Sequence, residues 1–428
     1  MKTYVVNGPA PLSGTVEISG AKNSALLVMA ASLMIQGEVT LRRVPKITDV
    51  WLMAEVLERL GAVVTFEEDH LTIDSSGELA EETPYELVGK MRASIQVLGP
   101  LLARRGEVRV AMPGGDAIGS RPVDLHLQGL ERMGAKFTVE HGYIEGRADR
   151  LKGTRILLEF PSVGATENLL MSAVTAEGTT VIDNAAREPE IQDLAMFLNA
   201  AGGRISGAGT PTITIAGVDE LAPVSHEIIP DRIEAGTFAI GAAATRGDVR
   251  LTNLRSDHLD LVLQKLTDAG AEVQRGSDEV RVAMSRRPEA LNLVTLPYPG
   301  FPTDLQPSIM VLLAQATGSS ILTENVFEAR FLFVDELNRM GSQIRVEGHH
   351  AVIRGAERLS GAPVQSTDIR AGAALVLGGL CAEGRTEVHD RGHIERGYED
   401  FVSKLTRLGA DIHLEDRAIE PQRGRPFS

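Results

Sequence analysis

The sequence predicts an α/β protein built from six similar units, which are grouped in two lobes. One element recurs six times as an apolar, helix-like run that ends in glycine and leads into a β-rich stretch. The glycines that end these runs are Gly37, Gly106, Gly178, Gly247, Gly318 and Gly384. A second helix-like run follows each time, ends in glycine and precedes two strands. Its glycines are Gly61, Gly134, Gly202, Gly270, Gly341 and Gly409. A period of about 70 residues therefore accounts for nearly the whole chain.

Each unit reads helix, strand, helix, strand, strand. The first helix, for example LLVMAASLMI at 26–35, is apolar almost all round, which predicts burial. The glycine after it supplies a left-handed cap that turns the chain into a strand. The second helix is amphipathic, with apolar Leu52, Val56 and Leu57 between charges, so we expect it to cover a sheet from outside.

A unit with strands outside and helices inside cannot close a core alone, so three units should form one lobe. We expect residues 21–230 to form one lobe, which carries a mobile Gly-rich loop. Residues 1–20 and 231–428 should form the second lobe, so that the first strand belongs to the C-terminal half. Two lobes with chain crossings between them predict a cleft that opens and closes, with the active site inside it.

Bulk properties exclude several classes of protein. A net charge of -15 argues against a general binder of nucleic acid or anionic membranes. The single cysteine, Cys381, excludes an intrachain disulfide framework and suits a reducing compartment. The first residues, MKTYVVNGPAPLSG, lack the apolar segment of a signal peptide, and no apolar run reaches the roughly 20 residues of a membrane helix. We expect a cytoplasmic protein without membrane insertion.

Charged residues stand at four places where the repeat predicts turns. The segments are GAKNSALL with Lys22 and Asn23, GDAIGSRPVDLH with Asp116 and Arg121, PYPGFPTDLQP with Asp304, and STDIRAG and HIERGY with Asp368, Arg370 and Arg396. Each has an ordinary alternative: a solvated lysine, a plain glycine turn, a helix N-cap, or surface ion pairs of little energetic consequence. Locally, Asp304 reads best as an N-cap.

Taken together, these residues indicate a binding site for a small anion. Cations at element ends come from both halves of the chain, namely Lys22, Arg92, Arg121, Arg370 and Arg396. If they converge on the cleft, they match a ligand with phosphate and carboxylate groups. Asp116 and Asp304 lie on opposite halves, as an acid and a base on either side of a substrate would.

Motifs over nearly the whole chain resemble those of the UDP-N-acetylglucosamine enolpyruvyl transferases. They are GAKNSALL, MRAS, PGGDAIGSRPVDLH, SVGATEN, NAAREPEI, PDRIEAGT, GFPTDLQ, TENVFEARF, DIRAGAALVL and HIERGY. The resemblance implies an inside-out α/β barrel of six βαβαββ units. It also implies transfer of the enolpyruvyl group of phosphoenolpyruvate to the 3'-hydroxyl of UDP-N-acetylglucosamine, with release of phosphate, as the first committed step of peptidoglycan synthesis. The mechanism that the resemblance implies requires no metal or organic cofactor.

The resemblance assigns roles to individual positions. Asp116, Asp304, Lys22 and Arg396 resemble the catalytic residues. The residues that resemble the family's phosphoenolpyruvate contacts are Lys22, Asn23, Arg92, Arg121 and Arg396. The residues that resemble the family's UDP-sugar contacts are Asn23, Arg92, Arg121, Pro122, Val123, Asp124, Leu125, Ser162, Val163, Gly164, Asp304 and Val326. The residues that resemble the family's supporting positions around the cleft and its loop are Glu188, Asp231, Asp368 and Arg370.

The chain departs from the family pattern at four positions. Asp116 replaces the usual loop cysteine, Phe160 a common lysine, Ala329 an asparagine and Glu395 an aspartate. Family members with the cysteine are alkylated by the epoxide fosfomycin, so this chain should be insensitive. A free aspartate titrates near 3.9, so Asp116 should become an acid only in a closed, ligand-bound state. Two alternatives stay open: an enolpyruvyl transferase acting on another uridine nucleotide, and an inactive binding homologue.

Overall fold

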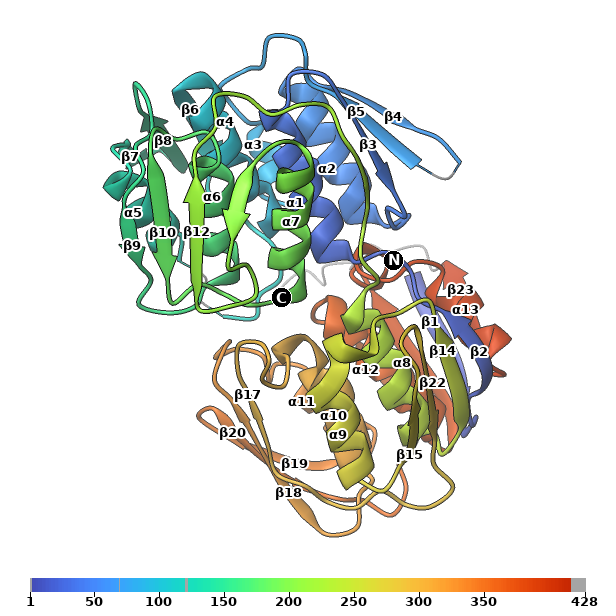
Figure 1. Ribbon diagram of the computed structural model, residues 1–428. Coiled ribbons are helices and arrows are strands. Elements are labelled where there is room, and N and C mark those ends of the chain that lie inside the picture. Colours follow the sequence, from blue (N-terminus) through green and yellow to red (C-terminus); the bar gives the residue numbers. More distant parts are fainter. Residues whose placement is uncertain (1, 69, 120–121, 417–428) are drawn as a thin grey trace, which may run out of the picture.

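The computed structural model describes residues 2–68, 70–119 and 122–416 and contains two separate hydrophobic cores. The first core draws its buried side chains from Ala21 to Ile229. The second draws them from Tyr4 to Ile18 and from Ile233 to Ile412. Figure 1 shows the helices of the two cores grouped in two halves of the molecule.

Three helices that are buried over most of their length form the centre of each core. In the first core they are α1 (Lys22–Ala31), α4 (Leu98–Arg105) and α6 (Val163–Ala173); in the second they are α8 (Arg232–Ala244), α10 (Gln306–Leu313) and α12 (Ile369–Cys381). Every residue of α10 is buried, and α10 packs against α8 and α12. The predicted buried helices are confirmed.

The second helix of each unit lies nearer the surface. These helices are α2 (Thr48–Arg59), α5 (Asp124–Arg132), α7 (Pro189–Ala200), α9 (Asp260–Asp268), α11 (Val334–Arg339) and α13 (Phe401–Arg407); α3 (Tyr85–Val88) is an additional turn. The prediction that they cover a sheet from outside is wrong for three of them, since α2 and α7 pack chiefly on α1, and α5 packs chiefly on α6. Because the sheets are outermost, the apolar faces of these helices pack on the inner helices.

Six small sheets surround the helices and repeat one pattern. Their strand orders are β13-β3-β5-β4, β6-β8-β7, β9-β10-β12-β11, β2-β14-β16-β15, β17-β18-β20-β19 and β21-β22-β1-β23. In the four-stranded sheets the first pair is parallel and the rest are antiparallel. The strands of the first core are β3 (Glu38–Arg42), β4 (Val63–Phe66), β5 (His70–Asp74), β6 (Glu107–Ala111), β7 (Lys136–Glu140), β8 (Tyr143–Arg147), β9 (Arg155–Leu157), β10 (Thr179–Asp183), β11 (Arg204–Ser206), β12 (Thr212–Ala216) and β13 (Ser225–Glu227).

The second core contains both ends of the described chain. Its strands are β1 (Lys2–Gly8), β2 (Ser13–Glu17), β14 (Asp248–Thr252), β15 (Glu272–Arg275), β16 (Glu279–Ala283), β17 (Leu293–Thr295), β18 (Ser319–Glu324), β19 (Gln343–Glu347), β20 (His350–Arg354), β21 (Pro363–Gln365), β22 (Gly384–Asp390) and β23 (Asp411–Asp416). β1 lies between β22 and β23 and is antiparallel to both, while β2 runs parallel to β14. The N-terminal strands therefore complete sheets that begin more than 200 residues later.

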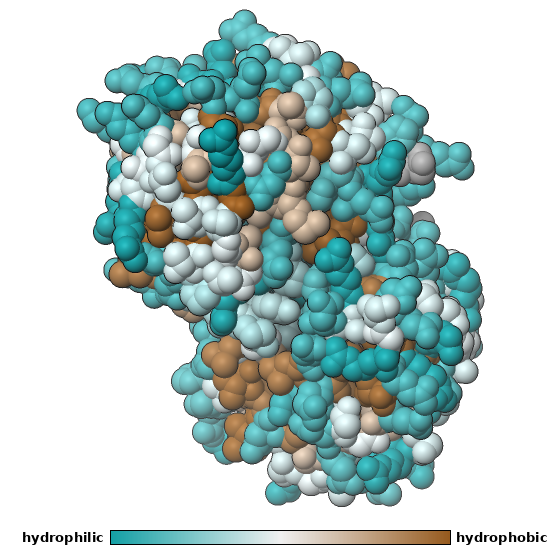
Figure 2. Space-filling model, viewed as in Figure 1, coloured by the Kyte–Doolittle hydropathy of each residue, from teal (hydrophilic) through white to brown (hydrophobic). Residues whose placement is uncertain are grey.

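The outer faces of the sheets meet solvent, and Figure 2 shows mostly polar side chains on the visible face. An exception lies over β17, β18 and β20, where apolar side chains gather. Val294, Leu296, Ile321 and Val352 are between 43% and 47% exposed there. No helix within the described residues is long and apolar enough to span a bilayer.

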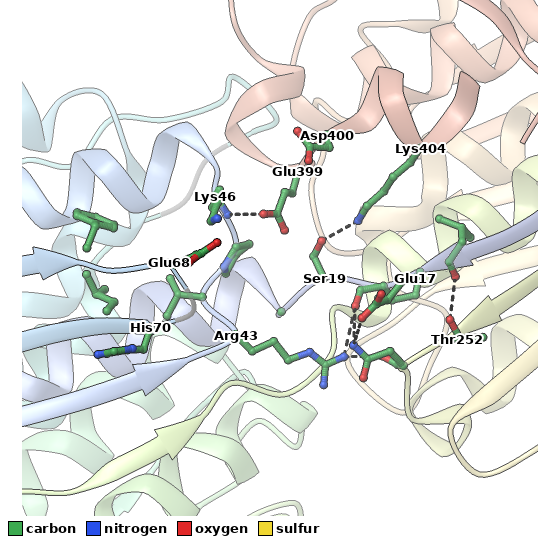
Figure 3. A pocket seen from close by; sticks show the side chains of 18 of the residues that line it. Glu17, Ser19, Arg43, Lys46, Glu68, His70, Thr252, Glu399, Asp400 and Lys404 are labelled. Carbon is green, nitrogen blue, oxygen red and sulfur yellow. Dashed lines mark hydrogen bonds between the residues drawn. The ribbon is translucent and has the colours of Figure 1, made fainter. Parts of the chain in front are cut away.

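The chain passes between the two cores at two adjacent segments. Ala21 N donates to Ile229 O at 2.7 Å, and Asp231 N donates to Ser19 O at 2.9 Å. A cavity of about 820 Å³, which we call the crossing cavity, lies beside these segments. Across it Arg43 Nη2 donates to Asn253 O at 2.6 Å (Figure 3). The crossing is thus held by two backbone–backbone hydrogen bonds and by the Arg43 side chain.

Candidate functional site

A cavity of about 600 Å³ between the two cores gathers many of the predicted residues, and we call it the cleft. Its lining includes Lys22, Asn23, Arg92, Asp116, Pro122, Leu125, Ser162, Val163, Gly164, Glu188, Asp304, Val326, Arg370 and Arg396. Four predicted residues do not line it: Val123, Asp124, Asp231 and Asp368. Arg121 lies outside the described residues.

Of the four predicted residues outside the lining, two belong to the start of α5 and two accept backbone N–H groups at helix starts. Val123 precedes α5 and is buried, and Asp124 is the first residue of that helix. Asp231 caps α8 and also accepts the backbone N–H of Lys22 at 3.1 Å. Asp368 caps α12 by accepting the N–H groups of Arg370 and Ala371 at 2.9 and 3.0 Å. Both aspartates therefore place a cation at a helix start.

Two cations from different cores meet at one buried carboxylate. Lys22 Nζ lies 2.8 Å from Asp49 Oδ2, and Arg396 Nε donates to Asp49 Oδ1 at 2.8 Å. Asp49 is 1% exposed. Burial lowers the pKa of Lys22, and the Asp49 charge opposes that shift. Asp49 thus keeps two cations side by side at one end of the cleft.

Asp116 reaches this group from the Gly-rich loop between β6 and α5. Its Oδ1 accepts a hydrogen bond from Arg396 Nη1 at 2.8 Å. Burial pushes the pKa of Asp116 upward, but His393, Arg396 and Lys22 together hold it well below the ordinary value. The loop also contacts the second core where Ala329 N donates to Ile118 O at 3.1 Å. In this arrangement Asp116 is an ionised carboxylate held across the cleft.

Asp304 occupies the opposite side of the cleft, in a short 3₁₀ turn, η4 (Thr303–Leu305). The locally favoured N-cap reading is wrong, because Pro302 precedes the turn and the carboxylate accepts side-chain donors. Arg330 Nη2 and Arg370 Nε donate to it at 3.0 and 3.2 Å. Burial raises the pKa of Asp304, but Arg370 and Arg330 outweigh that effect and keep it below its usual range. Asp304 is therefore ionised and able to accept a proton.

The rest of the cleft combines paired arginines with acidic and neutral groups: Arg232 pairs with Glu190, and Arg330 and Arg370 pair with Asp304. Burial and the neighbouring Glu190 and Glu188 raise the pKa of Glu167 well above the ordinary range. Burial, with a smaller contribution from Arg92, lowers the pKa of His126 to about 3. Phe160 is 43% exposed at the cleft. The Asp49 end, where Lys22 and Arg396 meet, therefore suits a small anion, and the rest of the cleft offers both charged and neutral contacts to the remainder of a ligand.

Sequence reasoning missed several residues of the site. Asp49, Arg330 and His393 contact the predicted residues directly. Asp49 stands in the first turn of an amphipathic helix, where an acidic residue ordinarily complements the helix dipole. Its second role becomes visible only when the two cores are placed together.

Comparisons with known proteins show the family of the chain. The family model described as EPSP synthase (3-phosphoshikimate 1-carboxyvinyltransferase) matches residues 6–405. The chain belongs to the EPSP synthase family. Within the EPSP synthase family, UDP-N-acetylglucosamine 1-carboxyvinyltransferase 2 of Carboxydothermus hydrogenoformans is 55% identical over 96% of this chain and 99% of its own length. UDP-N-acetylglucosamine 1-carboxyvinyltransferase of Mycolicibacterium paratuberculosis is 54% identical over 96% and 98%.

Solved structures of the EPSP synthase family share the fold. The enolpyruvyl transferase NikO from Streptomyces tendae is 27% identical, has a TM-score of 0.87, and the match covers 96% of this chain and 98% of that one. EPSP synthase from Acinetobacter baumannii, at 18% identity, has a TM-score of 0.74 over 97% and 100%. The predicted inside-out α/β fold and the family resemblance are confirmed.

Proposed function

We propose that this protein transfers the enolpyruvyl group of phosphoenolpyruvate to the 3'-hydroxyl of UDP-N-acetylglucosamine, releasing phosphate in peptidoglycan synthesis. The observation that carries the proposal is the pairing of Lys22 and Arg396 on Asp49, in a cleft that also contains Asp304. Relatives that are 54–55% identical and bear the name of this activity support the choice of substrates.

The donor occupies the cationic end. Its phosphate and carboxylate take the positive charge of Lys22 and Arg396, with Asn23, Arg92 and Arg121 as further contacts. These cations also stabilise the negative charge that grows on the phosphate as it leaves. Asp49 prevents the two paired cations from repelling each other before the donor arrives.

The nucleotide sugar occupies the rest of the cleft. We assign its contacts to the predicted residues that line the cleft, namely Pro122, Leu125, Ser162, Val163, Gly164 and Val326. The predicted residues Val123 and Asp124 do not line it. Asp304 takes the proton of the 3'-hydroxyl as the oxygen attacks C2 of the donor. A carboxylate with a lowered pKa can do so because the hydroxyl becomes far more acidic as the new C–O bond forms. Asp116 supplies the proton to C3, and loss of phosphate from the adduct gives the product.

We also propose that residues 21–230, and residues 1–20 with 231–428, are two lobes that close on the ligands. Two separate cores and the two adjacent crossings support this division. A cytoplasmic location is proposed because a lone cysteine suits a reducing compartment.

Phosphate release measured with each acceptor in turn tests the function. With phosphoenolpyruvate present, UDP-N-acetylglucosamine should support turnover, UMP should not, and Asp304→Asn should abolish turnover. Release with UMP alone would assign the protein to another uridine nucleotide. If no phosphate were released with either acceptor although the UDP-sugar still bound, the protein would be an inactive binding protein.

A further inference from the structure

His393 is held in place by a buried carboxylate at the end of β22. Asp390 is fully buried, and its oxygens accept the backbone N–H groups of Gly392, His393 and Ile394 at 3.1, 3.1 and 3.2 Å. These bonds form the turn that leads into η5 (Ile394–Arg396). His393 and Arg396 therefore have fixed positions relative to each other.

The His393 ring faces Asp116. Its Nδ1 lies 3.8 Å from Asp116 Oδ1, which is an ion-pair distance longer than a hydrogen bond. That nitrogen is buried and has no hydrogen-bond partner among residues 2–68, 70–119 and 122–416. Asp116 lines the cleft and His393 does not. His393 thus stands directly behind the carboxylate that meets the ligand.

Three charged groups face His393. The Asp116 carboxylate raises the pKa of the imidazole, and Asp390 adds to that effect. Burial and the positive charge of Arg396 oppose the rise, but the pKa stays above the ordinary value. At any pH below this raised pKa the imidazole is protonated. The neighbouring Asp116 is ionised, because its own pKa is lowered.

We propose that His393 is a positioning residue that holds on Nδ1 the proton which Asp116 delivers to the methylene carbon of the donor. The inference rests on the proposed function, because it concerns the same reaction at the same site. It answers a question that the site leaves open. An ionised Asp116 cannot act as an acid until it receives a proton, and the imidazolium is its immediate neighbour.

Donor binding provides the trigger. In the structure Arg396 Nη1 neutralises Asp116. When the anionic donor engages Arg396, Asp116 loses part of that compensation, so its affinity for a proton rises. The proton then passes from His393 Nδ1 to Asp116 Oδ1, which leaves a neutral imidazole and a neutral carboxylic acid.

The proton balance closes over one turnover. Asp116 gives its proton to C3 as the C2–C3 double bond opens and the acceptor oxygen bonds to C2. In the elimination Asp116 takes one proton back from the methyl group, the double bond re-forms, and the C2–O bond to phosphate breaks. Asp116 returns this proton to His393. The proton that Asp304 took from the hydroxyl leaves with the phosphate.

The test compares His393→Asn with His393→Ala in the full chain, using phosphate release. Asparagine places an N–H donor near the position of Nδ1 but cannot carry a transferable proton. We expect both variants to lose about 100-fold in kcat, as for loss of a proton-transfer group. The KM for phosphoenolpyruvate should change little. Wild-type kcat should fall as pH rises through the pKa of His393, and both variants should lack that limb.

Each other outcome is decisive. If His393→Asn restored most of the activity lost in His393→Ala and kept the pH profile, His393 would serve only as a hydrogen-bond donor and the inference would fail. A wild-type enzyme that released no phosphate would overturn the proposed function, and this inference with it. His413→Asn, on the exposed strand β23, is the matched control and should behave as wild type.

A second measurement is independent of turnover. Histidine NMR signals of the full chain, assigned with His393→Asn, should show His393 titrating above the ordinary value in wild type. In Asp116→Asn the same signal should titrate at lower pH, because the carboxylate that stabilises the imidazolium is gone. An unchanged titration would show that the two groups do not share a proton.

Discussion

Arg396 Nη1 donates to Asp116 Oδ1 at 2.8 Å, although the two residues lie 280 positions apart and belong to opposite sides of the cleft. The same guanidinium holds Asp49. A cation proposed to bind the donor therefore also fixes the Gly-rich loop in the described arrangement. Donor binding and loop position are consequently coupled through one side chain.

Replacement of Arg396 should affect both donor binding and stability. Arg396→Ala removes a donor ligand and leaves the buried Asp49 with one fewer partner. We expect a KM for phosphoenolpyruvate raised at least tenfold. The free energy of unfolding should fall by about 1–3 kcal/mol, the range for a buried polar group that loses its partner. Steady-state kinetics and urea unfolding measure the two effects, and an unchanged KM would remove Arg396 from the donor site.

The pH dependence of donor binding should report on Asp49. Burial already lowers the pKa of Lys22, and the Asp49 charge limits that fall. Lys22 binds the donor in its protonated form, so donor affinity is present at low pH and is lost as pH rises through the folded pKa. In Asp49→Asn that loss should occur at lower pH, because the opposing charge is gone. Profiles of donor KM against pH that coincide for the two proteins would contradict this role.

Gly114 should be essential for the loop. A Cβ added there would lie 1.8 Å from Gly89 O, so the loop would have to move away from its seat. Gly114→Ala should lower kcat at least tenfold, because a misplaced Asp116 cannot reach the donor. Gly77→Ala is the matched control, since its added Cβ would meet only an ordinary contact at 3.8 Å. Similar kinetics for the two variants would mean that the loop position is unimportant.

Fosfomycin should leave this enzyme unmodified. A carboxylate is a weak nucleophile towards an epoxide, and Asp116 stands where the resemblance places the reactive cysteine. The one thiol, Cys381, lies at the end of α12, and burial raises its pKa to about 12, so it carries almost no thiolate at neutral pH. Asp116→Cys should become sensitive to time-dependent inactivation. Intact-protein mass spectrometry with the nucleotide sugar present checks both statements, and an adduct on the unaltered chain would contradict them.

The repeat could be predicted from sequence because its signals are local. Gly106, for instance, ends α4 with φ 76°, as a left-handed cap requires. The packing of α2 on α1 could not be predicted, because an amphipathic pattern shows that a face is buried but not what covers it. The fold class and the buried helices can be predicted from the periodicity of the sequence, whereas the packing partner of each helix depends on the topology of the fold.

The site divides in the same way. Lys22, Asp304 and Arg370 could be singled out because charges at turns interrupt the repeat. Asp49 and His393 could not, since Arg396 lies 347 positions from Asp49 and Asp116 lies 277 positions from His393, and neither Asp49 nor His393 stands in an unusual local pattern. The strong shift in the pKa of Asp116 likewise depends on groups from both cores.

The position of β1 between β22 and β23 also has a consequence for how the polypeptide is made. During synthesis on the ribosome, residues 21–229 can collapse into the first core as soon as they emerge. β1 has no such opportunity, because both of its neighbouring strands are translated more than 370 residues after it. Until then it has unpaired backbone groups along both edges. Such strands tend to aggregate unless chaperones bind them. Residues 2–8 thus leave the ribosome long before the two strands that hold them in the folded protein.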